Sequence, residues 1–111
     1  MTDTHFSTDQ FHFVWDEDKN IKNIRKHGIS FDIALRVFDD EMRIEYLDLE
    51  HSQEEERYRT IGLVHDMLAV IYCERENAHS ENPDIRIISA RLATKLERNA
   101  YNNNIIGHCH Y

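Results

Sequence analysis

The sequence of 111 residues predicts an α+β domain, in which an antiparallel sheet carries two short helices near the N-terminus and one helix at the C-terminus. Short runs rich in β-branched and aromatic residues recur along the chain and predict strands. Segments with helical spacing follow the first of these runs and close the chain. We expect the helices on one face of the sheet. The chain fits a single domain at residues 11–104, with a flexible N-terminus at 1–10 and a flexible tail at 105–111.

The first strand is predicted at residues 11–15, where the sequence FHFVW is aromatic and β-branched. Asp16 follows this strand, and its carboxylate can cap a helix at residues 17–27. Within this helix Ile21 and Ile24 are spaced to lie on one face, which we expect to be its apolar face. The domain is therefore predicted to begin with a strand that leads directly into a helix.

A second, shorter helix is predicted directly after the first. Gly28 can adopt the left-handed conformation that ends many helices, and Ser30 is a favourable cap for the next one. The apolar residues of this second helix recur at helical spacing and are Phe31, Ala34, Leu35 and Phe38.

Four further strands are predicted at residues 42–47, 57–64, 67–74 and 85–89. The second and third of these are separated only by His65 and Asp66, so we expect them to form a hairpin. The third is the most continuously apolar and is expected at the centre of the sheet. A closing helix follows, with an apolar face of Leu92, Ala93, Leu96 and Ala100 and a basic face of Arg91, Lys95 and Arg98.

The net charge of −8 is distributed unevenly along the chain. Residues 1–56 hold 15 of the 21 acidic residues and 6 of the 13 basic ones, and residues 57–111 hold the remaining 6 and 7. A polyanionic partner would therefore have to bind a local basic patch. The longest apolar run, residues 67–73, is too short to cross a membrane, so we expect a cytoplasmic protein with no membrane contact.

Neither a metal nor a cofactor is expected. The motif His108-Cys109-His110 has ligand-like residues, but it lies in the predicted tail, and no second cluster has zinc-finger spacing. The sequence contains no glycine-rich phosphate loop and no nucleophile elbow. Cys73 lies within an apolar run and is expected to be a buried thiol.

Arginines in the second half of the chain are the most informative residues. Arg86 lies between Ile85 and Ile87, and if these isoleucines point into the core, Arg86 points away from the other face of the sheet. Arg57 and Arg59 occupy equivalent positions on an earlier strand, and guanidinium groups gathered on one face would form a fixed binding site for phosphate. In the alternative interpretation these are surface arginines paired with carboxylates, Glu97 among them.

Lys26 and His27 also allow two interpretations. As cations in the last turn of a helix before Gly28, they would interact favourably with the helix dipole. Functionally, histidine suits proton transfer near neutral pH, and a neighbouring lysine suits a phosphate. Tyr101 is either an ordinary aromatic residue of the core or surface, or a ring that stacks on a base or hydrogen-bonds to it.

Three stretches of the chain resemble, in order and spacing, the BrnT toxin family of bacterial type II toxin–antitoxin systems: FVWDEDKNIKNIRKHGISFDIALRVFDD, HSQEEERYRTIGLV and IRIISARLATKLERNAY. The resemblance covers roughly residues 11–101 and includes the motifs Lys-His-Gly, Glu-Glu-Arg-Tyr and Ile-Ser-Ala-Arg. It implies a RelE-like fold and a ribonuclease that inhibits translation. It also implies a BrnA-like antitoxin with a ribbon-helix-helix part that binds operator DNA, so that the toxin contacts operator DNA only indirectly through the antitoxin.

The resemblance places active-site residues at Lys26, His27, Arg57, Arg86, Arg91 and Tyr101. We hypothesise metal-independent cleavage of RNA, in which the ribose 2′-OH attacks the adjacent phosphate. In this hypothesis His27 is the base or the acid, the arginines hold the phosphate, and Tyr101 contacts a base. The alternative is a catalytically inactive toxin homologue that acts as an antitoxin-binding module or co-repressor.

Overall fold

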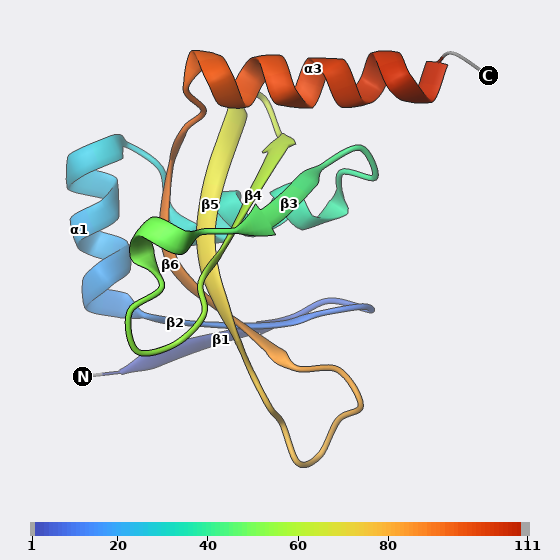
Figure 1. The fold of residues 1–111 in the computed structure, drawn as a ribbon. Coiled ribbons are helices and arrows are strands. Elements are labelled where there is room, and N and C mark those ends of the chain that lie inside the picture. The colour runs from blue at the N-terminus through green and yellow to red at the C-terminus, as the bar shows by residue number, and fades with distance from the viewer. Residues whose placement is uncertain (1, 110–111) are drawn as a thin grey trace.

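The computed structural model describes residues 2–109, except for the side chains of residues 51 and 105–109 (Figure 1). Its strands form one sheet, which α-helices and short 3-10 helices connect and cover. The elements in chain order are β1 (Asp3–Ser7), β2 (His12–Asp16), α1 (Glu17–His27), α2 (Phe31–Ala34), η1 (Leu35–Asp39), β3 (Ile44–Leu47), η2 (Leu49–His51), β4 (Tyr58–Leu63), β5 (Met67–Arg75), β6 (Asp84–Leu92) and α3 (Lys95–Cys109). Among the described residues, none of the helices has the length and apolar character needed to cross a membrane.

The strands are arranged in the order β1-β2-β6-β5-β4-β3. Strands β3 to β6 form an antiparallel meander, and β4 and β5 form the predicted hairpin. The prediction of a fully antiparallel sheet is wrong, because β2 pairs in parallel with β6 through Phe13–Ile85 and Val14–Arg86. Between β2 and β6 the chain forms α1, α2 and the strands β3, β4 and β5. Such a long connection permits parallel pairing. The sheet is therefore mixed.

The predicted caps of the first helix are present. The side chain of Asp16 accepts a hydrogen bond from the backbone N–H of Asp18 at 2.9 Å, and Gly28 ends α1 with a φ of 72°. The predicted second helix is divided, because α2 ends at Ala34 and a 3-10 helix, η1, continues to Asp39. The local signals therefore locate the helix ends better than they predict the type of helix.

Regular structure extends into both predicted flexible ends. Strand β1 lies in the segment 1–10 and pairs antiparallel with β2 at the edge of the sheet. Its sequence DTHFS is mostly exposed and lacks a clear apolar alternation, so the sequence contains little signal for it. At the other end, α3 continues to Cys109, whereas the sequence predicts a flexible tail from residue 105. Residues 110 and 111 of that tail lie outside the described residues.

Two clusters of buried side chains lie on opposite faces of the sheet. The larger cluster is covered by α2 and η1, and in it the ring centroid of Phe38 lies 5.1 Å from those of Phe13 and Tyr72. The smaller cluster joins Tyr101 of α3 to Ile61 of β4. The prediction of helices on one face is therefore wrong. The central strand β5 is buried at every position from Leu68 to Cys73, so both faces of the sheet need cover.

The predicted apolar face of the closing helix is also wrong. Arg91 and Leu92 belong to β6, so a helical count that includes them begins in a strand. Leu96 is 82% exposed, and α3 buries Glu97 and Tyr101 instead. In Figure 1, α3 lies across one end of the strands, beyond the last residues of β6.

Helix α1 attaches to the sheet through polar side chains. Ile21 and Ile24 are each 43% exposed, which contradicts the predicted apolar face, whereas Asn20 and Asn23 are buried. Strand β2 pairs with only a short stretch of β6. Further along β6, the side chain of Asn23 occupies the position that a neighbouring strand would take. Its Oδ1 accepts a hydrogen bond from the N–H of Ala90 at 3.1 Å, and its Nδ2 donates to the Ala90 carbonyl at 2.8 Å. This pairing fixes α1 along the edge of β6 (Figure 1).

Candidate functional site

A hollow of about 380 Å³ lies between α1 and the sheet. Every charged side chain that lines it is basic, although the whole chain has a net charge of −8. Such a local concentration of positive charge can bind an anion. The lining residues are Lys19, Lys22, Asn23, Lys26 and His27 from α1, Ile71 from β5, and Ile88, Ser89 and Arg91 from β6.

The cationic side of the hollow is one face of α1. Lys19, Lys22 and Lys26 recur at intervals of three and four residues, which places them on the same side of the helix. All three side chains are exposed, whereas His27 is half-buried in the last turn before Gly28. The C-terminal end of the helix dipole favours cations at this position. The helix therefore presents three exposed ammonium groups and one half-buried imidazole to the same space.

A β-bulge decides which side chains of β6 reach the hollow. Ile87 and Ser89 pair with consecutive residues of β5, so Ile88 is an extra residue in β6. Ile87 points into the larger core, and strict alternation from it would also turn Arg91 into that core. The extra residue reverses the alternation, so Ser89 and Arg91 instead line the hollow.

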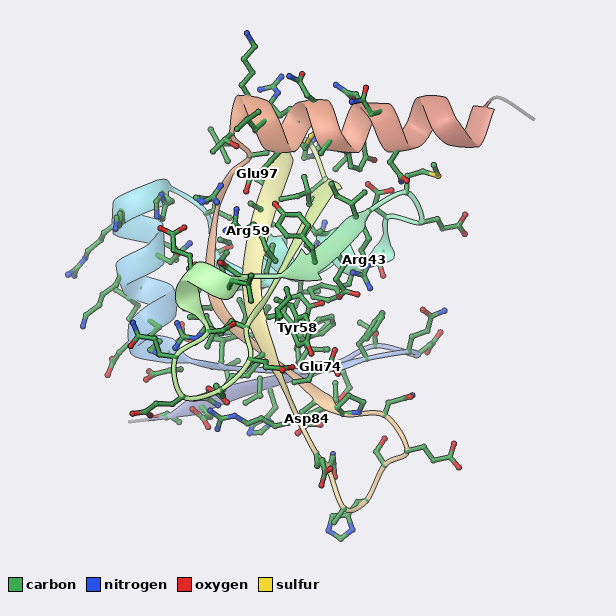
Figure 2. All side chains as sticks on the ribbon, in the orientation of Figure 1. Arg43, Tyr58, Arg59, Glu74, Asp84 and Glu97 are labelled. Atoms are coloured by element: carbon green, nitrogen blue, oxygen red, sulfur yellow. The ribbon has the colours of Figure 1, made fainter. Side chains whose placement is uncertain are left out.

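Arg91 is held at the hollow by a carboxylate from the first turn of α3. Its Nη1 and Nη2 atoms donate to Oε1 and Oε2 of Glu97 at 2.6 and 3.0 Å. Nη1 of Arg59 donates to Glu97 Oε2 at 2.8 Å, and Arg59 Nη2 lies 3.1 Å from Oδ1 of Asp48. We call the side chains of Glu97, Arg91, Arg59 and Asp48 the Glu97 network, and Figure 2 shows Arg59 near Glu97, below the start of α3. The alternative interpretation from the sequence, in which an arginine pairs with the carboxylate of Glu97, therefore applies to Arg91.

The Glu97 network is largely shielded from solvent. The exposed fractions of the side chains are 5% for Glu97, 1% for Asp48 and 17% for Arg59. Burial acts to raise the pKa of Glu97, but hydrogen bonds from Arg91, from the backbone N–H of Thr94 and from Arg59 outweigh it and lower this pKa to about 2. Burial acts to lower the pKa of Arg59, and its hydrogen bonds to Glu97 and Asp48 outweigh it and raise that pKa. Both groups are therefore charged at neutral pH.

Arg86 and Arg57 lie outside the hollow. The Nη1 and Nη2 atoms of Arg86 donate to the carboxylate of Asp3 at 3.3 and 3.2 Å, which joins β6 to β1. Arg57 lines a separate hollow, where most of the charged side chains are acidic. These two guanidinium groups therefore do not surround one phosphate together with Arg91. The other lining residues of the second hollow are Glu50, Gln53, Glu54, Glu55 and Arg75.

Tyr101 also lies outside the hollow. Its side chain is 3% exposed, and its hydroxyl donates to Oδ2 of Asp40 at 2.5 Å. Burial and this hydrogen bond raise the pKa of Tyr101 to about 12. The same Asp40 oxygen accepts a hydrogen bond from the N–H of Leu63 at 2.9 Å. Tyr101 therefore connects α3 to the chain segments around the smaller core.

Lys26, His27 and Arg91 are the residues selected from the sequence that line the hollow together. Lys19 and Lys22 were not selected from the sequence, although their helical spacing relative to Lys26 is a signal that could have found them.

Glu97 was considered only as an ordinary partner for a surface arginine. The sequence signal for a structural role of Glu97 is its spacing from Thr94, which is that of a capping box at the start of a helix. The backbone N–H of Thr94 donates to Glu97 Oε1 at 2.8 Å, and the N–H of Glu97 donates to Thr94 Oγ1 at 3.3 Å. A capping box predicts where this carboxylate lies, but the approach of two arginines depends on the tertiary fold.

Within the described part of the chain, no three His, Cys, Asp or Glu side chains gather in a way that could hold a metal ion. The motif His108-Cys109-His110 lies outside the described side chains. Cys73 is a buried free thiol, as predicted.

Comparison with models of known protein families gives a match over residues 15–97, to the family described as the ribonuclease toxin, BrnT, of type II toxin–antitoxin systems. The matched segment includes every residue that lines the hollow and all four members of the Glu97 network. It leaves out β1 and most of α3. No curated protein matches the chain.

Proposed function

The chain belongs to the BrnT family of ribonuclease toxins of type II toxin–antitoxin systems, and we propose that the hollow between α1 and β6 binds and cleaves its RNA substrate. One observation carries this proposal: all the charged side chains of the hollow are basic on an otherwise acidic chain. RNA carries a negative charge on every phosphate, and lysine and arginine are the side chains that bind it.

The reaction we propose needs no metal ion. The 2′-oxygen of a ribose attacks the adjacent phosphorus and loses its proton, and the bond from phosphorus to the 5′-oxygen breaks. The 5′-oxygen gains a proton, so the products end in a 2′,3′-cyclic phosphate and a 5′-hydroxyl. Histidine is the side chain type suited to proton transfer, and His27 is the histidine that lines the hollow, so we assign it the transfer of one of these protons.

Arg91 and Lys26 are proposed to stabilise the negative charge that develops on the phosphate oxygens. Arg91 suits this role because its guanidinium is already oriented by Glu97 and need not be ordered during the reaction. Lys26 is exposed and adjoins His27. Arg86 is engaged by Asp3, and Tyr101 by Asp40, so neither has a role in this proposal. Arg57 has none because its surroundings are acidic.

A type II toxin has an antitoxin partner, and we propose a BrnA-like antitoxin with a ribbon-helix-helix part. In this proposal the antitoxin covers the hollow and thereby excludes RNA. Operator DNA contacts the antitoxin and not this acidic chain. In this proposal the free toxin acts in the cytoplasm and inhibits translation by cutting RNA. We also propose that its fold is RelE-like.

A direct test is incubation of the purified protein, free of antitoxin, with RNA in the presence of EDTA. Cleavage products with 2′,3′-cyclic phosphate ends are expected. Arg91→Ala and His27→Ala should each lower kcat about 100-fold or more, because each removes a group that acts in the transition state. Arg98→Ala is the matched control, since it removes an exposed arginine of α3 outside the hollow. Cleavage by Arg91→Ala and His27→Ala at the wild-type rate contradicts the proposed site.

A second candidate function is supported by the Glu97 network. Both Nη atoms of Arg91 already contact a carboxylate, as expected if the arginine served the fold and not catalysis. The protein would then be an inactive homologue that binds an antitoxin or acts as a co-repressor. In the same experiment this function predicts intact RNA together with tight binding of the antitoxin.

A further inference from the structure

We propose that Glu97 is a positioning residue for the RNA-cleaving reaction, which fixes the guanidinium of Arg91 at the hollow without contacting RNA. The inference rests on the proposed function, because it assigns a task to Arg91 in the same site. Glu97 itself does not line the hollow, whereas Arg91 does.

The hydrogen bonds of Arg91 leave part of its guanidinium available to a ligand. Nη1 donates to Glu97 Oε1 and, at 3.3 Å, to the carbonyl of Leu92, and Nη2 donates to Glu97 Oε2. An arginine has five N–H donors, so one N–H of Nη2 and that of Nε make no hydrogen bond to the described residues. Glu97 therefore orients the planar group and leaves two adjacent donors for a phosphate oxygen.

Glu97 is itself fixed from the opposite side. Arg59 donates to its Oε2 at 2.8 Å, and the guanidinium of Arg59 lies over the ring of Tyr46 at 5.4 Å from the centroid. Asp48, which is almost fully buried, forms an ion pair with Arg59 at 3.1 Å. Figure 2 shows Glu97 beneath the start of α3 and Arg59 below Glu97. The carboxylate is thus held in one orientation by groups that lie away from the hollow.

The same carboxylate closes the capping box of α3. Its Oε1 accepts hydrogen bonds from both Arg91 Nη1 and the backbone N–H of Thr94. The start of α3 and the orientation of Arg91 are therefore fixed by one group. The two tasks can nevertheless be separated by substitution, because a glutamine can still complete a capping box, whereas it cannot form a charged, bidentate pair with a guanidinium.

The experiment compares Glu97→Gln with Thr94→Ala. Glu97→Gln keeps an oxygen for the Thr94 N–H and loses the charged pair, so kcat should fall about 100-fold, as expected for a misplaced transition-state group, with KM little changed. Thr94→Ala removes the side-chain half of the capping box and keeps the pair, so it should lower the melting temperature and leave kcat unchanged. The opposite pattern, in which Thr94→Ala loses activity and Glu97→Gln keeps it, contradicts the inference.

A double-mutant cycle separates positioning from a general effect on the fold. If Glu97 acts through Arg91, Glu97→Gln should have no further effect on kcat in the Arg91→Ala background. A residue that merely supports the fold would lower kcat in both backgrounds, and that result would refute the proposal. All rates are measured well below the melting temperature of each variant, so that a loss of stability is not read as a loss of activity.

A readout that does not depend on RNA cleavage makes the inference testable even if the wild type is inactive. Nuclear magnetic resonance of the guanidinium should show slow rotation about the Nε–Cζ bond of Arg91 in the wild type and in Thr94→Ala, and fast rotation in Glu97→Gln. Equal rotation in Glu97→Gln and wild type refutes positioning by Glu97. Absence of cleavage by a wild type with slow rotation refutes the proposed function and not the fixed orientation of Arg91.

Discussion

Asn23 pairs its side-chain amide with both the N–H and the carbonyl of Ala90, as a neighbouring strand would. This contact joins two segments that are 67 residues apart in the chain. It sets the distance between α1 and β6, and therefore the width of the hollow that their side chains line.

Asn23→Ala is expected to lower the free energy of unfolding by about 3 kcal/mol, because it leaves buried backbone groups of Ala90 without partners. The carbonyl of Ile29, which accepts a hydrogen bond from Asn23 at 2.8 Å, also loses its partner. Denaturation with urea measures this change, and Asn103→Ala, at an exposed position of α3, serves as the control. Equal stability of the two variants contradicts the role given to Asn23.

Acidification is expected to remove the stabilising contribution of Glu97. Its pKa in the folded protein is about 2, below its ordinary value of 4.5. A lowered pKa means that the folded state binds this proton more weakly, so the contribution is complete above the ordinary pKa and is lost as the pH falls toward the folded one. Melting temperatures of the wild type and Glu97→Gln should therefore differ most above about pH 5 and converge toward about pH 2. A difference that is constant over this range contradicts the prediction.

Tyr101→Phe is expected to affect stability and not RNA cleavage. The substitution removes a hydrogen bond to the carboxylate of Asp40 from a buried site, which costs about 2 kcal/mol. The ring lies outside the hollow, so kcat and KM should stay at wild-type values. Loss of cleavage without loss of stability would instead support the sequence-based assignment of Tyr101 to the active site.

Lys22→Ala is expected to weaken RNA binding in a salt-dependent manner. The side chain is exposed and lines the hollow, so it can contact a phosphate. Removal of one phosphate contact should reduce the slope of log affinity against log salt by about 0.7 for a single strand. Fluorescence anisotropy with a 2′-O-methyl oligonucleotide measures binding without cleavage, because the attacking hydroxyl is blocked. Arg25→Ala removes a charge from the same helix outside the hollow and should leave the slope unchanged.

Local sequence signals predicted the ends of α1 because capping depends on neighbouring residues. Asp16 and Gly28 act within the turns that they begin and end, so the residue type alone indicates the position. The same reasoning failed for Ile21 and Ile24. Their spacing predicted a buried face, but the face that meets the sheet is the one with Asn23, because an unpaired strand edge requires polar partners.

The candidate site was only partly accessible from the sequence, because its geometry depends on long-range pairing. Lys26 and His27 are neighbours in the last turn of α1, so the helix alone brings both side chains to the hollow. Their approach to Arg91 depends on the attachment of α1 to the edge of β6. Alternation from Ile85 correctly placed Arg86 opposite the larger core, but it could not predict that the strand shifts its register before Arg91.

Strand β6 contains one residue more than its pairing with β5 requires. Ile87 and Ser89 already occupy consecutive pairing positions, so deletion of Ile88 would leave an unbroken strand in which Ala90 still faces the larger core and Arg91 the hollow. Regular pairing of Ile88 would instead turn the guanidinium of Arg91 into the apolar interior. Relatives that preserve the chemistry should therefore tolerate both exchange and loss of this isoleucine.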